Sequence, residues 1–229
     1  MTANLDIFPE RQRLWEGVIL GSVIHAIMVA RYPELAHEQS WDGTNYNVQD
    51  SMGSRGTVSF SGNRLVGAFF DAKSPRNPFQ SDGAYDVTKA SRKMPSEHRR
   101  LAEGEAFQYL LQEYQGKTVP VVTAAFWNEG PRLTAAEPWR LVYENGAHLL
   151  RRQLMEMDMA LAEWRQAYGM SAPQVELARK LFEQKILNPG APIVLSADES
   201  LVVQAGAQGP EGLDTSRESF AEIGITLPG

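Results

Sequence analysis

Residues 41–79 read WDGTNYNVQDSMGSRGTVSFSGNRLVGAFFDAKSPRNPF, and this stretch decides the fold. Apolar and polar residues alternate over three short runs, Asn45 to Asp50, Thr57 to Ser61 and Leu65 to Asp71, with turn residues between them. Alternation with a period of two is typical of strands that bury one face. The stretch therefore predicts a three-stranded antiparallel meander, which ends at the Ser74 to Pro78 segment.

The chain before this stretch predicts one long helix. Gly17 to Ala30 is an uncharged, mostly apolar run, and it is shorter than the roughly 20 residues that a membrane-spanning helix needs. A helix from near Pro9 to Arg31 fits better, because proline favours the first helical turn. We expect this helix to pack on one face of the sheet, with His25 in its core. Gly17 and Gly21 share one face of the helix and predict the close approach of another backbone.

The chain after this stretch predicts one more strand and a series of helices. Thr118 to Trp127 is a continuous apolar run, which is typical of a buried central strand. Ser171 with Gln174 and Ser196 with Glu199 have the spacing of helix capping boxes. The expected helices are Ser96 to Tyr114, Pro138 to Tyr143, Gly146 to Tyr168, Pro173 to Leu187, a short one after Ser196, and a last one from Asp214.

These elements predict an α+β fold. Its antiparallel sheet has about four to five strands, from the meander near residues 45–71 and the strand near residues 118–127. The N-terminal helix packs on the sheet, and the C-terminal half is rich in helices. A chain of 229 residues is long enough for one large core. We expect a single domain over residues 1–229, and a subdivision into an α+β core (1–133) and a helical part (134–229) stays open.

Composition excludes several classes of function. The chain has no cysteine, so it has no disulfides, no thiol catalysis and no thiolate metal site. The histidine spacings match no metal motif, and no glycine-rich phosphate loop occurs, so we expect neither a metal nor a cofactor. The net charge of −6 argues against a nucleic-acid partner. With no membrane-spanning segment and no recognisable signal peptide, the expected location is the cytoplasm.

Charge is unevenly distributed along the chain. Residues 72–100 hold seven basic and three acidic side chains, a local net charge of about +4. Residues 191–229 hold six acidic side chains and one arginine, about −5. The basic cluster is interpreted either as a site for an anion or acidic partner, or as a solvated face that docks on the protein's own acidic C-terminal segment. The sequence leaves both interpretations open.

Function is predicted from the polar and aromatic residues of the 41–79 stretch. Strands and turns with so many donors, acceptors and rings are suited to a binding surface. We therefore expect a non-enzymatic module that binds an unidentified protein or small-molecule ligand, and a homodimer is left open. The predicted binding residues are Trp41, Asp42, Asn45, Tyr46, Asn47 and Arg76.

An enzymatic alternative uses a carboxylate and a histidine. Asp50 or Asp71 serves as the general base with His148, next to an anion-binding arginine, in a small-molecule hydrolase. Asp71 ends a strand and His148 follows the Asn145-Gly146 turn, and both are positions where functional groups often occur. No serine lies in a nucleophile motif, and no catalytic motif is complete. The binding hypothesis is therefore favoured.

Overall fold

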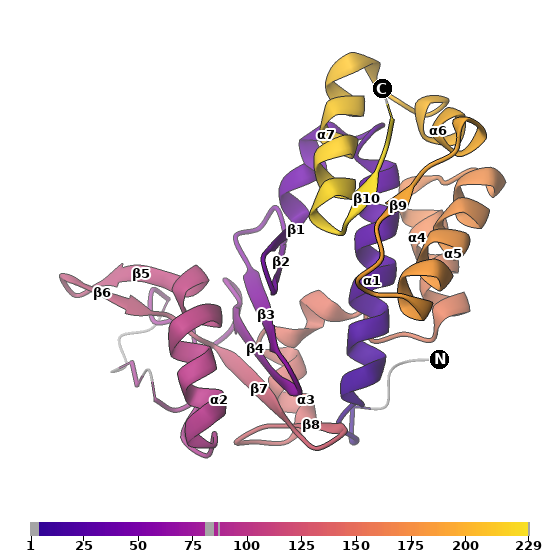
Figure 1. The fold of residues 1–229 in the computed structure, drawn as a ribbon. Helices are drawn as coiled ribbons and strands as arrows, with labels where there is room; N and C mark the ends of the chain where they lie inside the picture. Colours follow the sequence, from indigo (N-terminus) through magenta and orange to yellow (C-terminus); the bar gives the residue numbers. More distant parts are fainter. Residues whose placement is uncertain (1–4, 81–84, 87, 229) are drawn as a thin grey trace. The chain divides into compact units, whose positions relative to one another are not determined.

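The computed structural model describes residues 5–80, 85–86 and 88–228. The chain divides into two compact units (Figure 1). The first, here called the sheet unit, consists of residues 1–13 and 42–151; the second, the helical unit, consists of residues 14–41 and 152–229. One division falls inside helix α1 (Arg11–Met28) and another inside strand β1 (Gln39–Asp42).

The main sheet has six strands in the order β1-β2-β3-β4-β7-β8, and each pair from β2 onwards is antiparallel. The predicted meander is confirmed, since Thr57 in β3 lies opposite both Asn47 in β2 and Ala68 in β4. The sheet is larger than expected because short strands flank it on both edges. The strands after β1 are β2 (Asn45–Gln49), β3 (Arg55–Ser61), β4 (Arg64–Phe70), β7 (Ala124–Glu129) and β8 (Arg132–Thr134).

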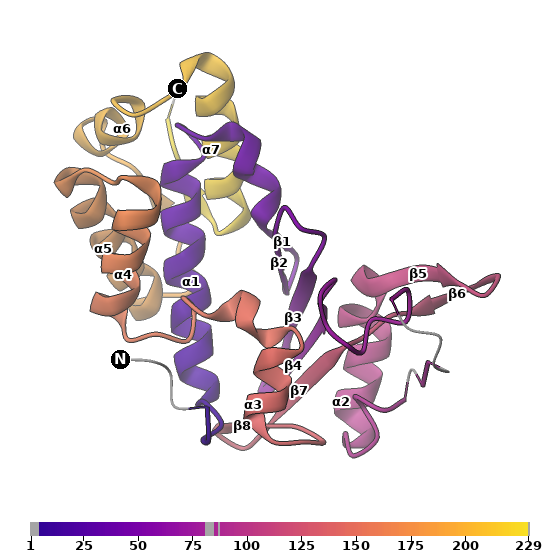
Figure 2. The same cartoon turned by 180° about the vertical axis from the view of Figure 1, so that it is seen from behind.

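Helices cover both faces of this sheet within the sheet unit. On one face, α2 (Ser96–Leu101) and the π-turn that continues it (Ala102–Ala106) bury the side of β4 that carries Val66 and Ala68. On the other face lies α3 (Trp139–Glu144), whose Trp139 ring is 5.7 Å from the Phe126 ring. Figures 1 and 2 show α2 and α3 on opposite sides of the strands. The fully covered central strands are β4 and β7.

The first turn of α1 is tied to the sheet. The amide of Arg11 donates to the carbonyl of Pro131 at 2.7 Å, and its guanidinium donates to the carbonyl of Gly62 at 2.8 Å. Glu10 also forms an isolated antiparallel bridge with Arg132 in β8. The expected association of the N-terminal helix with the sheet is thus confirmed at the point where the helix begins.

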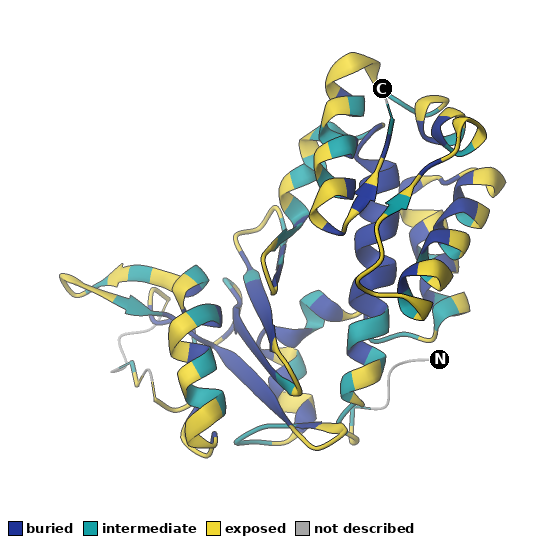
Figure 3. Ribbon diagram, viewed as in Figure 1, coloured by how far each residue is buried: buried dark blue, intermediate teal, exposed yellow. Residues whose placement is uncertain are grey.

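The predicted helix over Ser96 to Tyr114 and the predicted strand over Thr118 to Trp127 were both too long. Between them the chain forms a hairpin of β5 (Leu111–Tyr114) and β6 (Lys117–Pro120), separate from the main sheet. Its two turn residues, Gln115 (φ 51°) and Gly116 (φ 74°), both have a left-handed backbone, which matches the twist of a tight hairpin. The hairpin is largely exposed, as Figure 3 shows.

The helical unit is built around α1. Every residue of α1 from Gly17 to Met28 is buried, which agrees with its mostly apolar sequence. The cluster around it includes Trp164, Leu181 and Phe220. The elements that surround α1 are α4 (Met157–Tyr168), α5 (Ala172–Leu187), α6 (Ala197–Gln204), α7 (Gly209–Glu222) and the parallel pair β9 (Ile193–Val194) and β10 (Ile225–Thr226).

Among the predicted helices after residue 145, both predicted capping boxes are confirmed, whereas two predicted helix starts are wrong. Both predicted capping boxes are present, at the start of α5 and of α6. The single helix expected from Gly146 to Tyr168 is instead a short 3-10 turn (Ala147–Leu150), a bend and α4, and Gly146 has a φ of 153° that is not helical. The last helix, α7, begins at Gly209 and not at Asp214, with Pro210 in its first turn.

The close approach predicted at Gly17 is confirmed. A Cβ atom there would lie 1.7 Å from the backbone oxygen of Gln153. Gly21 is approached by side chains instead, with a Trp164 ring atom 3.2 Å from the position of its Cβ.

In the described part of the chain, no helix combines the length and the apolar character required to cross a bilayer.

Candidate functional site

A pocket of about 540 Å³ lies at one end of the main sheet. β4 ends there, and the antiparallel pairing places the start of β7 and the end of β8 beside it. Four separate segments contribute to the wall, and all belong to the sheet unit. The lining residues are Pro75, Arg76, Pro78, Tyr85, Asp86, Lys89, Ala90, Arg92, Lys93, Val122, Thr123, Ala136 and Glu137.

The loop after β4 is held by three turns of one kind. Asp71, Ser74 and Asn77 follow one another at intervals of three residues, and all three are buried. Each accepts, through its side-chain oxygen, the amide two residues ahead (2.9–3.1 Å), and through its carbonyl the amide three residues ahead (2.9–3.1 Å). Such side-chain-capped turns fix a backbone without regular secondary structure. Arg76 is thereby carried on an ordered segment.

The guanidinium of Arg76 has two protein partners. It donates to both carboxylate oxygens of Glu137, at 2.5 and 2.7 Å, in a two-pronged pair. One of its nitrogens also donates to the carbonyl of Thr123 at 3.0 Å. Both charged side chains are only about a quarter exposed, at 24% and 23%. Planar pairs of this geometry are among the stronger charge-assisted contacts in proteins.

A buried polar network lies behind this arginine. The hydroxyl of Ser74 donates to the side-chain oxygen of Asn145 at 2.6 Å, and the hydroxyl of Thr123 donates to the carbonyl of Asn145, also at 2.6 Å. The same Thr123 hydroxyl accepts the amide of Asp71 at 2.9 Å. Every hydroxyl in the network has a partner, so the wall that carries Arg76 is held from three segments of the chain.

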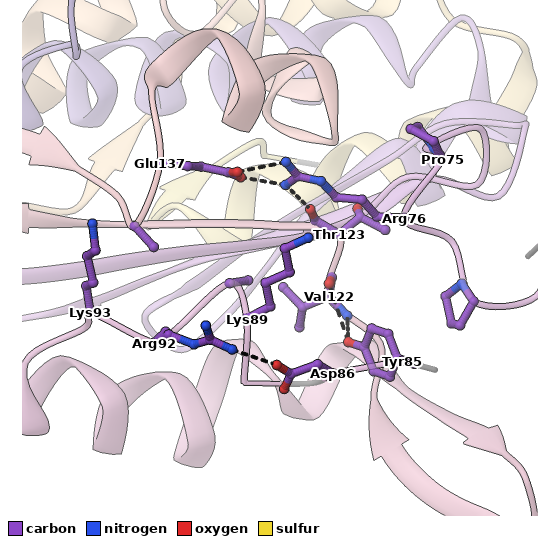
Figure 4. A pocket seen from close by; sticks show the side chains of 13 residues that line it. Pro75, Arg76, Tyr85, Asp86, Lys89, Arg92, Lys93, Val122, Thr123 and Glu137 are labelled. Atoms are coloured by element: carbon purple, nitrogen blue, oxygen red, sulfur yellow. Dashed lines mark hydrogen bonds and ion pairs between the residues drawn. The ribbon is translucent and has the colours of Figure 1, made fainter. Parts of the chain in front are cut away.

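The pocket has an excess of positive charge. It is lined by four cationic and two anionic side chains, a net charge of +2. Arg92 pairs with Asp86 at 2.9 Å in an exposed contact. Lys89 and Lys93 form no ion pair with any residue in the described ranges. Figure 4 shows both lysines extending toward the side of the pocket where Arg76 and Glu137 lie.

Tyr85 contributes its aromatic ring to the pocket lining, and its phenol group does not ionise near neutral pH. Its hydroxyl donates to the carbonyl of Pro120 at 3.0 Å and accepts the amide of Val122 at 2.6 Å. Burial raises the pKa of Tyr85 to about 12, a shift that the hydrogen bond to Val122 opposes and nearby Asp86 reinforces. Its ring packs edge-on against Tyr114 of the β5–β6 hairpin at 5.8 Å. The phenol therefore stays neutral at physiological pH.

The predicted binding residues fall in several places. Arg76 lines the pocket. Asp42 and Asn45 meet around Tyr109, whose hydroxyl donates to the Asp42 carboxylate at 2.5 Å and lies 3.4 Å from the Asn45 side-chain amide. That amide also donates to Glu105 at 2.7 Å. Burial and the carboxylate of Asp42 raise the pKa of Tyr109. Asp42 and Asn45 thus form a second polar cluster outside the pocket.

The remaining predicted binding residues are mostly covered. Tyr46 is fully buried, and Asn47 accepts the hydroxyl of Thr57 at 2.7 Å. Trp41 belongs to the helical unit, where its indole nitrogen donates to Ser22 at 2.9 Å and its amide donates to Glu222 at 2.8 Å. Of the five predicted residues in the sheet unit, Arg76 lines the pocket, and Asp42 and Asn45 form the separate cluster around Tyr109.

The candidate catalytic residues have other partners. Asp50 accepts the amides of Met52 and Ser54, both at 2.9 Å, through one carboxylate oxygen. Asp71 accepts the hydroxyl of the same Ser54 at 3.2 Å. The Nδ1 atom of His148 lies 3.2 Å from the carbonyl of Tyr143. Among the described residues, neither carboxylate forms a hydrogen bond with His148.

Sequence reasoning missed several residues of the pocket. Thr123 and Glu137 in the lining, and Asn145 in the network behind it, come from segments far from Arg76 in the chain, so no local pattern could connect them. The spacing of Asp71, Ser74 and Asn77 was a usable signal for an ordered loop, although the loop was expected only as a break in regular structure. No group of three or more histidine and acidic side chains with a geometry suited to a metal occurs in the described part of the chain.

Comparison with known proteins adds no further assignment. No family model matches this chain, and no curated protein and no solved structure matches it either.

Proposed function

We propose that the sheet unit is a non-enzymatic binding module whose ligand is a small organic anion. The observation that carries this proposal is the 540 Å³ pocket with a net charge of +2, in which Lys89 and Lys93 have no ion-pair partner in the described ranges. A pocket of about 300–1,000 Å³ is typical for a small-molecule ligand. Two ammonium groups that share a concave wall attract negative charge more strongly than isolated surface lysines do.

The lining also supports an organic ligand over a bare inorganic ion. Pro75, Pro78, Ala90 and Val122 contribute apolar surface, and Tyr85 contributes a ring. Small-molecule sites commonly combine such apolar walls with a few fixed polar groups. The capped turns and the network behind Arg76 hold this wall in place, which lowers the entropy lost on binding.

Isothermal titration calorimetry on the full-length protein tests the proposal. The probes are citrate and phthalate, with benzoate as a comparator of single charge. We expect the two multiply charged acids to bind more tightly than benzoate, and their affinity to fall as sodium chloride is added, because the attraction is screened. The double variant Lys89→Gln/Lys93→Gln should lose at least about tenfold in affinity for citrate, the equivalent of roughly 0.7 kcal/mol per charge.

A matched control removes two positive charges elsewhere in the sheet unit. Lys117 in β6 and Arg132 in β8 are exposed and lie outside the pocket. The double variant Lys117→Gln/Arg132→Gln should bind citrate as the unmodified protein does. Equal losses in both double variants would mean that net charge alone is measured, and the proposed site would be wrong. Absence of heat with every probe would also contradict the proposal.

A further inference from the structure

The two partners of the Arg76–Glu137 pair are held very differently. Arg76 is fixed independently of Glu137, because its guanidinium donates to the carbonyl of Thr123 and its backbone amide donates to the hydroxyl of Ser74 at 3.1 Å. Among the described residues, the carboxylate of Glu137 hydrogen-bonds only to Arg76. Loss of the pair would therefore leave the arginine in position and would release the glutamate.

The place of Glu137 in the chain agrees with such a release. It lies between the end of β8 (Thr134) and Pro138, the residue that precedes α3. Glutamate has three rotatable side-chain bonds, and the pair lines an open pocket, so its carboxylate can turn away without a change in the backbone. The guanidinium would then present the same two N–H donors to another planar oxyanion.

The geometry points to an exchange at Arg76: a carboxylate of the ligand replaces the carboxylate of Glu137, while a second acidic group of the ligand lies against Lys89 or Lys93. This inference rests on the proposed function and specifies its ligand as an organic acid with at least two negative charges. Glu137 is then an internal competitor that weakens binding and rejects ligands too weakly charged to displace it.

Removal of the competitor tests this exchange. In Glu137→Gln the neutral amide keeps the size of the side chain and cannot form the charged pair. We expect the Kd for phthalate and citrate to fall about fivefold, because a partly exposed ion pair contributes up to about 1 kcal/mol. The measurement is titration calorimetry on the full-length variant, with thermal unfolding to verify that the protein is folded.

Asp86→Asn is the matched control. Asp86 lines the same pocket and also pairs with an arginine, Arg92, so this variant makes the same change in pocket charge without freeing Arg76. The gain in Glu137→Gln should exceed the gain in Asp86→Asn. The gain should also vanish when Arg76→Gln is combined with Glu137→Gln, because the freed guanidinium is then absent.

These titrations distinguish failure of the exchange at Arg76 from failure of anion binding in the pocket. If the unmodified protein binds the probes and Glu137→Gln binds them no more tightly than Asp86→Asn does, the exchange is wrong and anion binding in the pocket stands. The same holds if Glu137→Gln remains folded and binds more weakly, because Glu137 would then only support the wall. If neither the unmodified protein nor any of these variants binds citrate or phthalate, both claims fall.

Discussion

At the scale of single residues, the environment decides what a charged group can do. The guanidinium of Arg76 is held in a half-buried wall by a carboxylate and a carbonyl that both accept its hydrogen bonds. His25, in contrast, is 3% exposed on α1, and its Nε2 atom lies 3.3 Å from the carbonyl of Ala36. No hydrogen-bond partner for its Nδ1 atom lies in the described part of the chain. The imidazole is therefore neutral.

Burial lowers the pKa of His25 to about 4, against a usual value of 6.5. The hydrogen bond to Ala36 opposes this shift, and the nearby charge of His37 adds to it. The unfolded chain takes up a proton on His25 below about pH 6.5, whereas the folded chain does so only near pH 4. Stability attributable to His25 is therefore complete above pH 6.5 and is lost as pH falls from 6.5 to 4.

This linkage predicts the acid sensitivity of the helical unit. Between pH 7 and pH 5 the unmodified protein should lose about 2 kcal/mol more unfolding free energy than His25→Leu, which has no titrating group at this position. Urea unfolding at both pH values, followed by far-UV circular dichroism, measures the difference. Parallel losses in the two proteins would mean that His25 does not carry this linkage.

At the scale of elements, Gly17 lets another backbone segment pack directly against helix α1. The backbone oxygen of Gln153 occupies the space that a Cβ atom on Gly17 would need. Alanine is the better helix former by about 1 kcal/mol, so helix propensity alone would favour it at this position. Glycine is the more stable residue at position 17 because the close contact with Gln153 would cost alanine more than its helix propensity gains.

Gly17→Ala should therefore destabilise the protein by about 2–3 kcal/mol, the usual cost of overpacking a filled site. Gly104 is the matched control, because it lies in the π-turn after α2, and no described residue beyond its own stretch of helix approaches the position of its Cβ within 4 Å. Gly104→Ala should be neutral or slightly stabilising. Thermal unfolding of both variants decides the matter, and equal effects would contradict the role given to Gln153.

The helices and strands that the sequence predicted correctly are those with a signal in a short stretch of neighbouring residues. The alternation in β2 to β4 and the serine caps of α5 and α6 are local signals, and all were confirmed. The β5–β6 hairpin was not predicted, because Gln115 takes a left-handed conformation that is uncommon for glutamine. Gly116 was the one turn residue that the sequence offered there. The bend after Gly146 was missed because the apolar spacing around it still suggested a helix.

The candidate site shows the same limit. Arg76 was among the predicted binding residues, and the positive charge of residues 72–100 was visible in the sequence. Glu137 and Thr123 approach Arg76 only because β8 and β7 pair in register with their neighbours at that end of the sheet. Contacts between segments so far apart depend on tertiary packing, which no short window of sequence contains.

At the scale of the whole molecule, neither unit is a continuous stretch of chain. The helical unit needs residues 14–41 as well as residues 152–229. Its hydrophobic cluster contains seven fully buried residues of the earlier segment, namely Leu20, Val23, Ile24, Ala26, Ile27, Met28 and Ala30. Without them, α4, α5 and α7 lose the central helix on which their buried apolar residues converge.

A fragment of residues 152–229 should therefore lack stable structure on its own. We expect its far-UV circular dichroism to show little helix and no cooperative thermal transition. Addition of a synthetic peptide of residues 14–41 should restore both, because it supplies the central helix. A cooperative transition of the fragment alone would contradict this account of the core.

The discontinuity of the helical unit also sets an order of events during synthesis on the ribosome. Helix α1 is translated before the helices that bury it, and residues 42–151 come between them. At about 5–20 residues per second, this delay is on the order of ten seconds. For that time the apolar residues of α1 lack the helices that bury them in the folded protein. The sheet unit can fold in the interval, so translation itself would separate the two folding steps.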